Sequence, residues 1–365
     1  MEEKKKGVPR YVGIDLGKRT YEMAIVGKGG KATMSNGKTF EAGRQSLYKK
    51  LRATDIVGLE AGNMAFIMAK EIEAAVGCQV HVLNASHLPL IYGSMKKTDK
   101  EDALKLAHIV EYFPRERLPL VPLPSEKEIK RRKILAYYRR TRQSRSRGIN
   151  QLHGLFVSSG ITTMKRSDFS TSENRLEAIQ LLSGIEREEA DYLAACLERY
   201  EQRIQALNLK IKEESAGDDE IQRLQSIPGV GPITAFAFVS RVASERFENS
   251  GQVSNYLGLV PRVYISGDTE KYGQITKRGN SYIRALLVQA SWSLVLAKKD
   301  SKLKGRYNYM TLEKSKSKKK AIVAVARRLG ELMYTLMRDK TLYMPKPFTL
   351  KMSKGEEIAR VAMSA

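Results

Sequence analysis

The amino-acid sequence predicts an α/β domain followed by a mainly α-helical remainder. Between residues 9 and 112, short apolar segments of strand character alternate with segments of helical periodicity. Beyond residue 125 the patterns are mainly helical. With 365 residues, the chain is long enough for two or three domains that each bury a core.

The elements of the first region follow a recognisable order. We expect three short strands joined by glycine-containing turns, at residues 10–16, 20–27 and 31–37. The segments expected next are a helix at 43–53, a strand at 55–61, a helix at 64–77, a strand at 79–84 and a helix at 100–113. A meander of three strands followed by alternating helices and strands is typical of a ribonuclease-H-like α/β domain.

The middle of the chain carries a helical seam. Prolines between residues 114 and 124 predict an extended connection to a very basic helix, and a second long helix follows. The second helix has apolar residues at intervals of three and four, namely Ala190, Leu193, Leu197, Tyr200, Ile204, Leu207 and Ile211. We expect a coiled coil between copies of the chain, with a helical hairpin inside one chain as the alternative.

These patterns divide the chain into four parts. We expect a first domain over residues 1–158, which includes the basic helix, and a helical coiled-coil region over 159–220. A mainly α C-terminal domain over 221–345 and a tail over 346–365 follow.

The charge of the chain indicates its class of partner. A formal net charge of +24 and a pI near 9.8 imply a polyanion, because such an excess of charge otherwise repels itself. No apolar run approaches the roughly 18 residues of a spanning helix, and residues 1–10 do not resemble a signal peptide. We therefore expect nucleic acid rather than a membrane as the partner. Cys78 and Cys196 are expected to be packed thiols in a reducing cytoplasm, where the protein would associate with the nucleoid.

Two basic groups are candidates for nucleic-acid contact. From Lys130 to Arg147 there are nine Lys or Arg residues and no acid, and such a helix is either a solvated face or a surface for the nucleic-acid backbone. The candidates on this helix are Lys130, Arg131, Arg132, Arg139, Arg140, Arg142, Arg145 and Arg147. A glycine-containing loop and the helix after it add Arg262, Lys271, Lys277, Arg278 and Arg284.

Four carboxylates stand at positions that suit a metal site. Asp15 and Glu60 end two predicted strands, and Asp99 and Asp102 share one face at the start of a helix. In a ribonuclease-H-like sheet those strands lie side by side and the last helix packs across them, so all four would converge. Taken singly, each could be a turn, surface or capping residue. Together they would repel unless they bound cations, and oxygen ligands suit Mg²⁺ or Mn²⁺.

The motifs, taken in order, resemble those of a known family. The segments GIDLGK, GLEAG, KTDKEDA, IPGVGPITA, LGLVPRVYISGDTEKYGQITKRGNSYIRALLVQAS and KKKAIVAVARRL are similar to the DEDD insertion-sequence transposases. These are bridge-RNA-guided recombinases related to the Piv-like DNA invertases. The resemblance covers roughly residues 10–345.

This resemblance implies a mechanism and partners. It implies a RuvC-like domain in which Asp15, Glu60, Asp99 and Asp102 bind Mg²⁺, and a transposase domain with a nucleophilic serine in a Ser-Gly loop. That serine corresponds to Ser266, although Ile265 and Asp268 replace the serine and glycine that many relatives carry beside it. Ser281 is the second candidate.

The resemblance further implies that DNA is cut and rejoined through a phosphoserine link. A structured non-coding guide RNA would pair with donor and target DNA, and the enzyme would work as a dimer or tetramer. Two alternatives stay open at this point. One is a RuvC-like nuclease that hydrolyses branched or hybrid nucleic acid, and the other is a non-catalytic nucleic-acid-binding protein.

Overall fold

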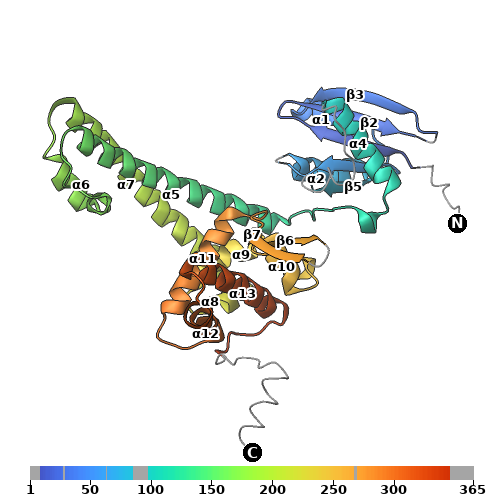
Figure 1. The fold of residues 1–365 in the computed structure, drawn as a ribbon. Helices are drawn as coiled ribbons and strands as arrows, with labels where there is room; N and C mark the ends of the chain where they lie inside the picture. Colours follow the sequence, from blue (N-terminus) through green and yellow to red (C-terminus); the bar gives the residue numbers. More distant parts are fainter. Residues whose placement is uncertain (1–8, 28, 63, 85–97, 267–268, 346–365) are drawn as a thin grey trace, which may run out of the picture. The chain divides into compact units, whose positions relative to one another are not determined.

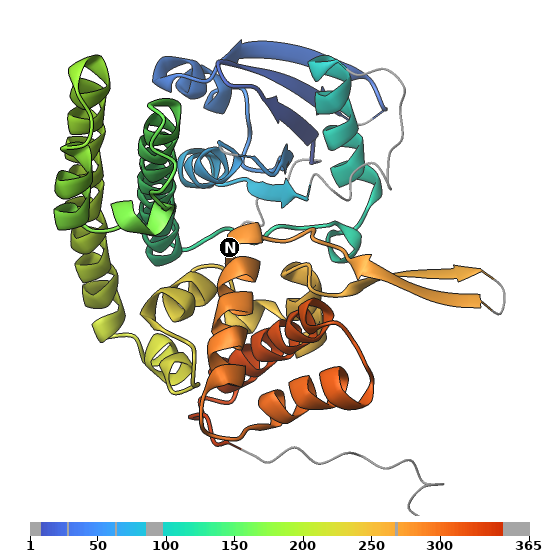
Figure 2. The same cartoon turned by 60° about the vertical axis from the view of Figure 1, so that its left-hand side comes forward.

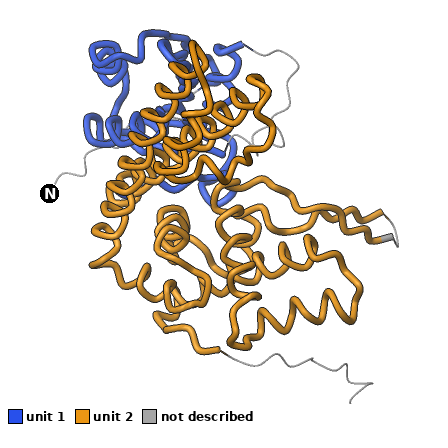
Figure 3. The backbone as a smooth tube through the Cα atoms, turned by 90° about the vertical axis from the view of Figure 1, so that its left-hand side faces the viewer, with its two compact units in different colours: residues 1–125 blue, residues 126–365 orange. Residues whose placement is uncertain are grey.

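The chain forms two compact units, residues 1–125 and residues 126–365 (Figure 3). A computed structural model describes residues 9–27, 29–62, 64–84, 98–266 and 269–345. The expected tail at 346–365 and Gly267 of the Ser-Gly loop lie outside the described residues. The basic helix belongs to the second unit, which differs from the expected boundary at residue 158 because this helix packs on helices of that unit.

The first unit is built on a five-stranded mixed sheet (Figure 1). The strands are β1 (Tyr11–Leu16), β2 (Thr20–Val26), β3 (Ala32–Lys38), β4 (Ile56–Glu60) and β5 (Gln79–Leu83), in the order β3-β2-β1-β4-β5. The first three strands are antiparallel neighbours, whereas β4 runs parallel to both β1 and β5. The expected mixed α/β domain is confirmed, and its sheet is compatible with a ribonuclease-H-like domain.

Helices cover both faces of this sheet. They are α1 (Glu41–Tyr48), α2 (Ala65–Val76) and α4 (Asp99–Tyr112), followed by a 3₁₀ turn, η1 (Arg115–Arg117). Because strand side chains alternate between faces, Val12 and Leu59 point to the core shared with α1 and α2. On the opposite face, Ala24 and Val26 pack against α4.

Two glycines allow α4 to lie directly on the sheet backbone. Gly13 of β1 pairs with Gly58 of β4. A Cβ atom on Gly13 would lie 2.0 Å from the carbonyl oxygen of Ala103, and one on Gly58 would lie 2.9 Å from Cγ1 of Val110. The absence of side chains at both positions therefore sets the position of α4 over β1 and β4.

The second unit combines a long helical hairpin with a compact helical body (Figure 1). The hairpin consists of α5 (Glu126–Ser158) and α7 (Gly184–Ala216), with η2 (Arg166–Phe169) and α6 (Ser172–Ile179) at its tip. The helices of the body are α8 (Asp219–Gln225), α9 (Pro232–Val239), η3 (Ser244–Arg246), α10 (Ser250–Tyr256), α11 (Ser281–Leu296), α12 (Lys302–Asn308), the π-helical turn η4 (Tyr309–Glu313) and α13 (Lys318–Arg338). A hairpin of β6 (Pro261–Ser266) and β7 (Thr269–Ile275) projects from this body (Figure 2).

The apolar seam of α7 packs on α5 of the same chain. Leu197 of the seam shares a core with Phe156 of α5, and Ile211 shares another with Ile134. Within one chain the structure corresponds to the hairpin alternative, because α5 packs on the seam, and a coiled coil between copies stays a prediction. Among the described residues, no helix is long and apolar enough to cross a membrane.

A buried ion pair fastens α5 to α8. Arg131 and Asp218 form this pair with side chains that are 3% and 8% exposed, and Asp218 also accepts a 3.1 Å hydrogen bond from the backbone N–H of Ile221. Burial alone would raise the pKa of Asp218, but hydrogen bonds from Arg131 and Lys127 outweigh it and lower the pKa to about 2. Folding therefore gains stability from this carboxylate above its ordinary pKa, and the gain is lost as the pH falls toward 2.

We expect Asp218→Asn to destabilise the second unit by about 2–3 kcal/mol at pH 7, because it leaves the Arg131 charge buried without a partner. The fluorescence of Trp292, the single tryptophan, reports unfolding of this unit in urea. The neighbouring acid provides a matched control, since Asp219 is 80% exposed and its removal should change the unfolding free energy by less than about 0.5 kcal/mol. Equal effects of the two substitutions would contradict the prediction.

Candidate active site and nucleic-acid groove

The four acids predicted from the sequence lie at one end of the first unit. Asp15 follows Gly13 by two positions on β1, and Glu60 follows Gly58 by two positions on β4. Side chains two apart on a strand share a face, so both acids lie on the face that α4 covers. Asp99 and Asp102 occupy the first turn of α4.

The charges of these acids act on one another. Burial first, and then the negative charges of Asp99, Asp102 and Glu60 in that order, together raise the pKa of Asp15 from its ordinary value of 3.8 to about 6. The structure therefore brings all four acids within electrostatic reach. An acid held among other acids is stable only if protons or cations offset the repulsion.

The arrangement is not yet that of a closed metal site. Among the described residues, no group of three or more His, Cys, Asp or Glu side chains is close enough to hold a metal ion. One oxygen of Asp102 instead accepts a 2.9 Å hydrogen bond from the ammonium of Lys105. Thr98 rather than Asp99 is the N-cap of α4, since its hydroxyl accepts from the backbone N–H of Glu101. The Asp99 carboxylate is therefore not required for capping.

A fifth acid, Glu22, was missed by sequence reasoning. It lies on β2 directly opposite Asp15 in the antiparallel register, so the two side chains share the α4 face. Its Oε2 atom is buried and has no hydrogen-bond partner within the described part of the chain. The spacing of Glu22, Ala24 and Val26 only weakly indicated that they share one face of a strand. The register of β1 and β2 is needed to show that Glu22 lies beside Asp15. All-oxygen ligands with uncompensated charge fit a divalent cation.

We expect Glu22→Gln to raise the free energy of unfolding of the metal-free first unit by about 0.5–1 kcal/mol, because it removes one of several crowded negative charges. The same change should weaken Mn²⁺ binding about 10-fold, measured by calorimetry. Glu116→Gln, on an exposed turn of the same unit, serves as the control. Unchanged Mn²⁺ affinity in Glu22→Gln would show that Glu22 has no part in the site.

Three arginines of the basic helix are occupied within the chain. Arg131 is buried against Asp218, and Nε of Arg132 donates a 2.8 Å hydrogen bond to the carbonyl of Ser240. Arg145 binds Glu201 at the hairpin tip. Each of these three arginines thus has a partner within the chain, and their contact with nucleic acid stays a prediction. The partners of these arginines lie far away in the sequence. The absence of acids between Lys130 and Arg147 therefore does not mean that the folded helix has no acidic neighbours.

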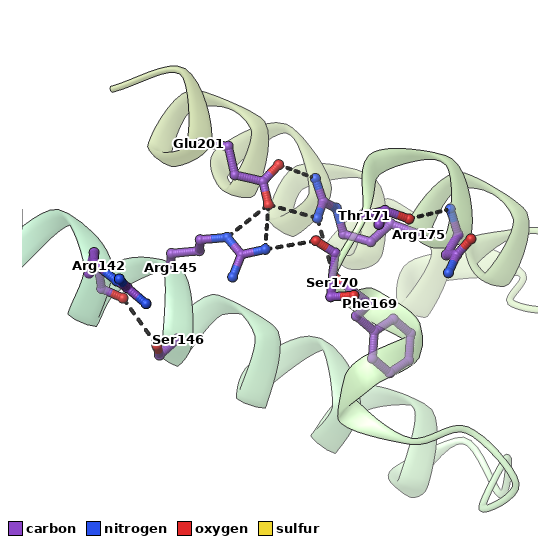
Figure 4. Close-up of polar contacts among 9 residues, drawn as sticks. Arg142, Arg145, Ser146, Phe169, Ser170, Thr171, Arg175 and Glu201 are labelled. Atoms are coloured by element: carbon purple, nitrogen blue, oxygen red, sulfur yellow. Dashed lines mark hydrogen bonds and ion pairs between the residues drawn. The ribbon is translucent and has the colours of Figure 1, made fainter. Parts of the chain in front are cut away.

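The carboxylate of Glu201 joins three helices near the tip of the hairpin (Figure 4). It accepts a 2.8 Å hydrogen bond from Nε of Arg145 and bonds of 3.0 and 2.7 Å from Arg175. Burial would raise the pKa of Glu201, but the hydrogen bonds from Arg175 and Arg145 lower it overall. Arg145 also donates to the carbonyl of Ser170 at 2.7 Å. Arg145 of α5 therefore contacts both α7 and the segment between η2 and α6.

Three other basic residues of α5 face a groove between α5 and α11. Its volume is ≈ 680 Å³, and its lining includes Arg139, Arg142 and Arg147 from α5. The first turn of α11 contributes Ser281 and Tyr282, and the guanidinium of Arg139 lies 5.2 Å from the ring centre of Tyr282. Guanidinium groups, a helix N-terminus and an aromatic ring are groups that contact phosphates and bases.

Two further candidates on α5 lie at its surface. Arg140 is exposed, and the exposed Lys130 forms an ion pair with Glu214.

The nucleic-acid candidates of the C-terminal domain also include both residues with partners in the chain and exposed residues. Arg284 donates hydrogen bonds of 2.6 and 3.2 Å to the carbonyls of Gly279 and Leu257, and its contact with nucleic acid stays a prediction. The other four candidates remain exposed, namely Arg262, Lys271, Lys277 and Arg278. Ser266 is exposed at the end of β6, where it pairs with the first residue of β7.

Comparison with known proteins identifies the family. Residues 12–159 match the family model of a DEDD transposase, and residues 221–308 match the model described as transposase IS116/IS110/IS902 family. The chain belongs to this family of insertion-sequence transposases. The first match contains all four acids of the transposase, and the second contains Ser266.

Named relatives span most of the transposase. A probable family 20 transposase of Pseudomonas aeruginosa is 26% identical over 92% of this chain and 98% of its own length. The transposase for insertion sequence element IS1111A of Coxiella burnetii is 25% identical over 92% of this chain and 91% of its own. The transposase for IS1328 of Yersinia enterocolitica is 27% identical over 77% and 82%. The expectation of a DNA transposase is confirmed.

Proposed function

We propose that this transposase cuts and rejoins DNA through a phosphoserine intermediate, with Asp15, Glu60, Asp99 and Asp102 holding Mg²⁺ or Mn²⁺. The observation that carries the metal site is the raised pKa of Asp15 among three other carboxylates. The unpartnered oxygen of Glu22 adds to the same uncompensated charge. Divalent ions bound there would lower the pKa of an attacking hydroxyl and stabilise the charge on the leaving oxygen.

Ser266 is the proposed nucleophile. Its Oγ forms a bond to a DNA phosphorus atom, its proton passes to a base or water, and the P–O bond to one strand breaks. The leaving oxygen takes up a proton, and the phosphate stays on the serine. A hydroxyl of the new partner strand then attacks the same phosphorus and releases Ser266. Each step exchanges one phosphate ester for another, so no external energy source is needed.

Nucleic acid would be bound by the second unit. The groove of α5 and α11 supports this proposal, because Arg139, Arg142 and Arg147 converge there without an acid in its lining. We propose donor and target DNA and a structured non-coding guide RNA as the ligands, with base pairing providing most of the sequence choice.

Assembly into a dimer or tetramer is also proposed. The projecting β6–β7 hairpin supports it, since Val263, Ile265 and Tyr272 are largely exposed on a two-stranded sheet that has little stability alone.

A denaturing gel tests the proposal. DNA carrying the ends of the element, incubated with the guide RNA, Mg²⁺ and the transposase, should give a protein–DNA adduct that survives denaturation. Chelation of Mg²⁺ should abolish it. Cleavage with free ends and no adduct at any time would instead identify the hydrolytic nuclease alternative.

A further inference from the structure

A cluster of three arginines around one glutamate lies between α12 and α13. Nε of Arg327 donates a 3.0 Å hydrogen bond to Glu331, and Arg328 donates one of 2.5 Å to the other oxygen. The hydroxyl of Ser254 donates to Glu331 at 2.7 Å. The third arginine, Arg306 of α12, lies within electrostatic reach of all three charged residues.

Arg306 carries the least compensated charge of this cluster. Its Nε atom is buried and has no hydrogen-bond partner among the residues that the structure describes. Burial lowers the pKa of Arg306, and the charge of Arg328 lowers it further. Three guanidinium groups against one carboxylate leave two positive charges in a partly buried place. Such an excess is costly unless an anion binds.

The adjoining surface is strongly basic. Between Lys314 and Lys320 the sequence KSKSKKK has five lysines and no acid, and all seven residues are exposed. Three of these lysines form the first turn of α13, where the helix dipole is already positive. Lys320 and Arg327 are seven residues apart, which places both on one side of α13. The α12 helix also continues into the π-helical turn η4, a geometry found frequently at functional sites.

We propose that this α12–α13 surface, comprising Arg306, Arg327, Arg328 and the lysines of 314–320, binds the phosphodiester backbone of nucleic acid. Guanidinium groups bind phosphate oxygens through paired hydrogen bonds, which would offset the uncompensated positive charge of this cluster. The surface shares no residue with the α5–α11 groove. This proposal rests on the proposed binding of nucleic acid by the second unit, and it assigns a second contact area to that unit.

Substitution of Arg306 tests the proposal against a structural role. Arg306→Gln should leave the thermal stability of the free protein unchanged or raise it, because an unpaired buried charge is removed. Its affinity for a 40-bp DNA duplex or a 40-nucleotide RNA hairpin, measured in chelator, should fall roughly 3- to 10-fold, and the slope of log K against log salt should decrease by about 1. Replacing Lys318, Lys319 and Lys320 together with glutamine should reduce the slope by about 2–3.

Arg338→Gln is the matched control, since Arg338 lies on the same helix and pairs with Asp339 at the surface. A larger loss for the duplex than for the hairpin, or the reverse, identifies which nucleic acid binds here. The proposal is overturned if Arg306→Gln lowers the melting temperature by several degrees while its salt slope matches that of Arg338→Gln. If the unaltered protein binds neither probe, the proposed binding function fails instead, so the two failures are distinguishable.

Discussion

Replacing Asp15 with asparagine is expected to abolish strand cleavage and, at the same time, to stabilise the metal-free protein. Cleavage should fall at least about 100-fold, because Asp15 is the most central of the proposed metal-binding acids. Stability should rise because the wild-type carboxylate is held among three others, which raises its pKa to about 6. An acid kept among other acids in order to bind a metal ion would lower folding stability in this way.

The pH dependence of this effect has a definite sign. The folded state binds the proton of Asp15 more tightly than the unfolded state, so the wild type loses stability as the pH rises from 3.8 to about 6. The pKa shift limits this loss of folding free energy to at most about 3 kcal/mol. Because Asp15 is partly exposed to solvent, we expect a loss of about 1–2 kcal/mol. Asp15→Asn and wild type should therefore be equally stable near pH 4 and differ above pH 6.

Hydrogen exchange of β1 in chelator provides the measurement, since Trp292 reports only on the other unit. Asp55 of the same unit offers a contrast, because it accepts hydrogen bonds of 2.9 and 2.7 Å from Arg10. Asp55→Asn should accelerate exchange where Asp15→Asn slows it. Faster exchange in Asp15→Asn at pH 7.5 would show that its carboxylate stabilises the fold, contrary to the proposal.

Ser266→Ala is expected to remove the covalent adduct while leaving nucleic-acid binding and Mn²⁺ affinity unchanged. An exposed serine hydroxyl is a weak nucleophile by itself, so its reactivity has to come from a neighbouring base or metal site. Loss of the attacking oxygen should reduce strand exchange by more than about 10³-fold. Adduct formation by the purified variant, followed on a denaturing gel with end-labelled DNA, gives the direct measurement.

The second serine candidate provides the control. Ser281 lies in the α5–α11 groove at the start of α11, so Ser281→Ala should weaken DNA binding slightly and still form the adduct. The opposite pattern, with the adduct lost only in Ser281→Ala, would transfer the nucleophile to the groove. If both variants still formed the adduct, neither serine would be the nucleophile.

The first unit was largely predictable because its elements carry strong local periodicity. The strand of Asp15 and the strand of Glu60 are short, mainly apolar segments, and each predicted helix begins or ends close to its observed limits. The proximity of the four predicted acids followed from the order of strands and helices along the chain. Glu22 was missed because its role depends on the antiparallel register of β1 and β2, which no local pattern specifies.

The partners of the basic helix within the chain were not predictable, for a different reason. Arg131 and Arg140 look alike in sequence, yet one is buried against Asp218 and the other is exposed. Their difference depends on which face of α5 meets α7 and α8, and on an acid that lies 87 residues away. Counting charges along a helix identifies a basic surface only after the tertiary partners of each charge are known.

The paired glycines beneath α4 bear on ion selectivity. Helix and sheet already touch through bare backbone at Gly13 and Gly58, so the gap between the acids of α4 and those of the strands cannot narrow further and would widen with a single added methyl group. Mg²⁺ requires ligands at about 2.1 Å, whereas Ca²⁺ accepts about 2.3–2.6 Å and more of them. A Cβ atom at either glycine would therefore be expected to weaken the binding of Mg²⁺, which needs the shorter distances, more than that of Ca²⁺.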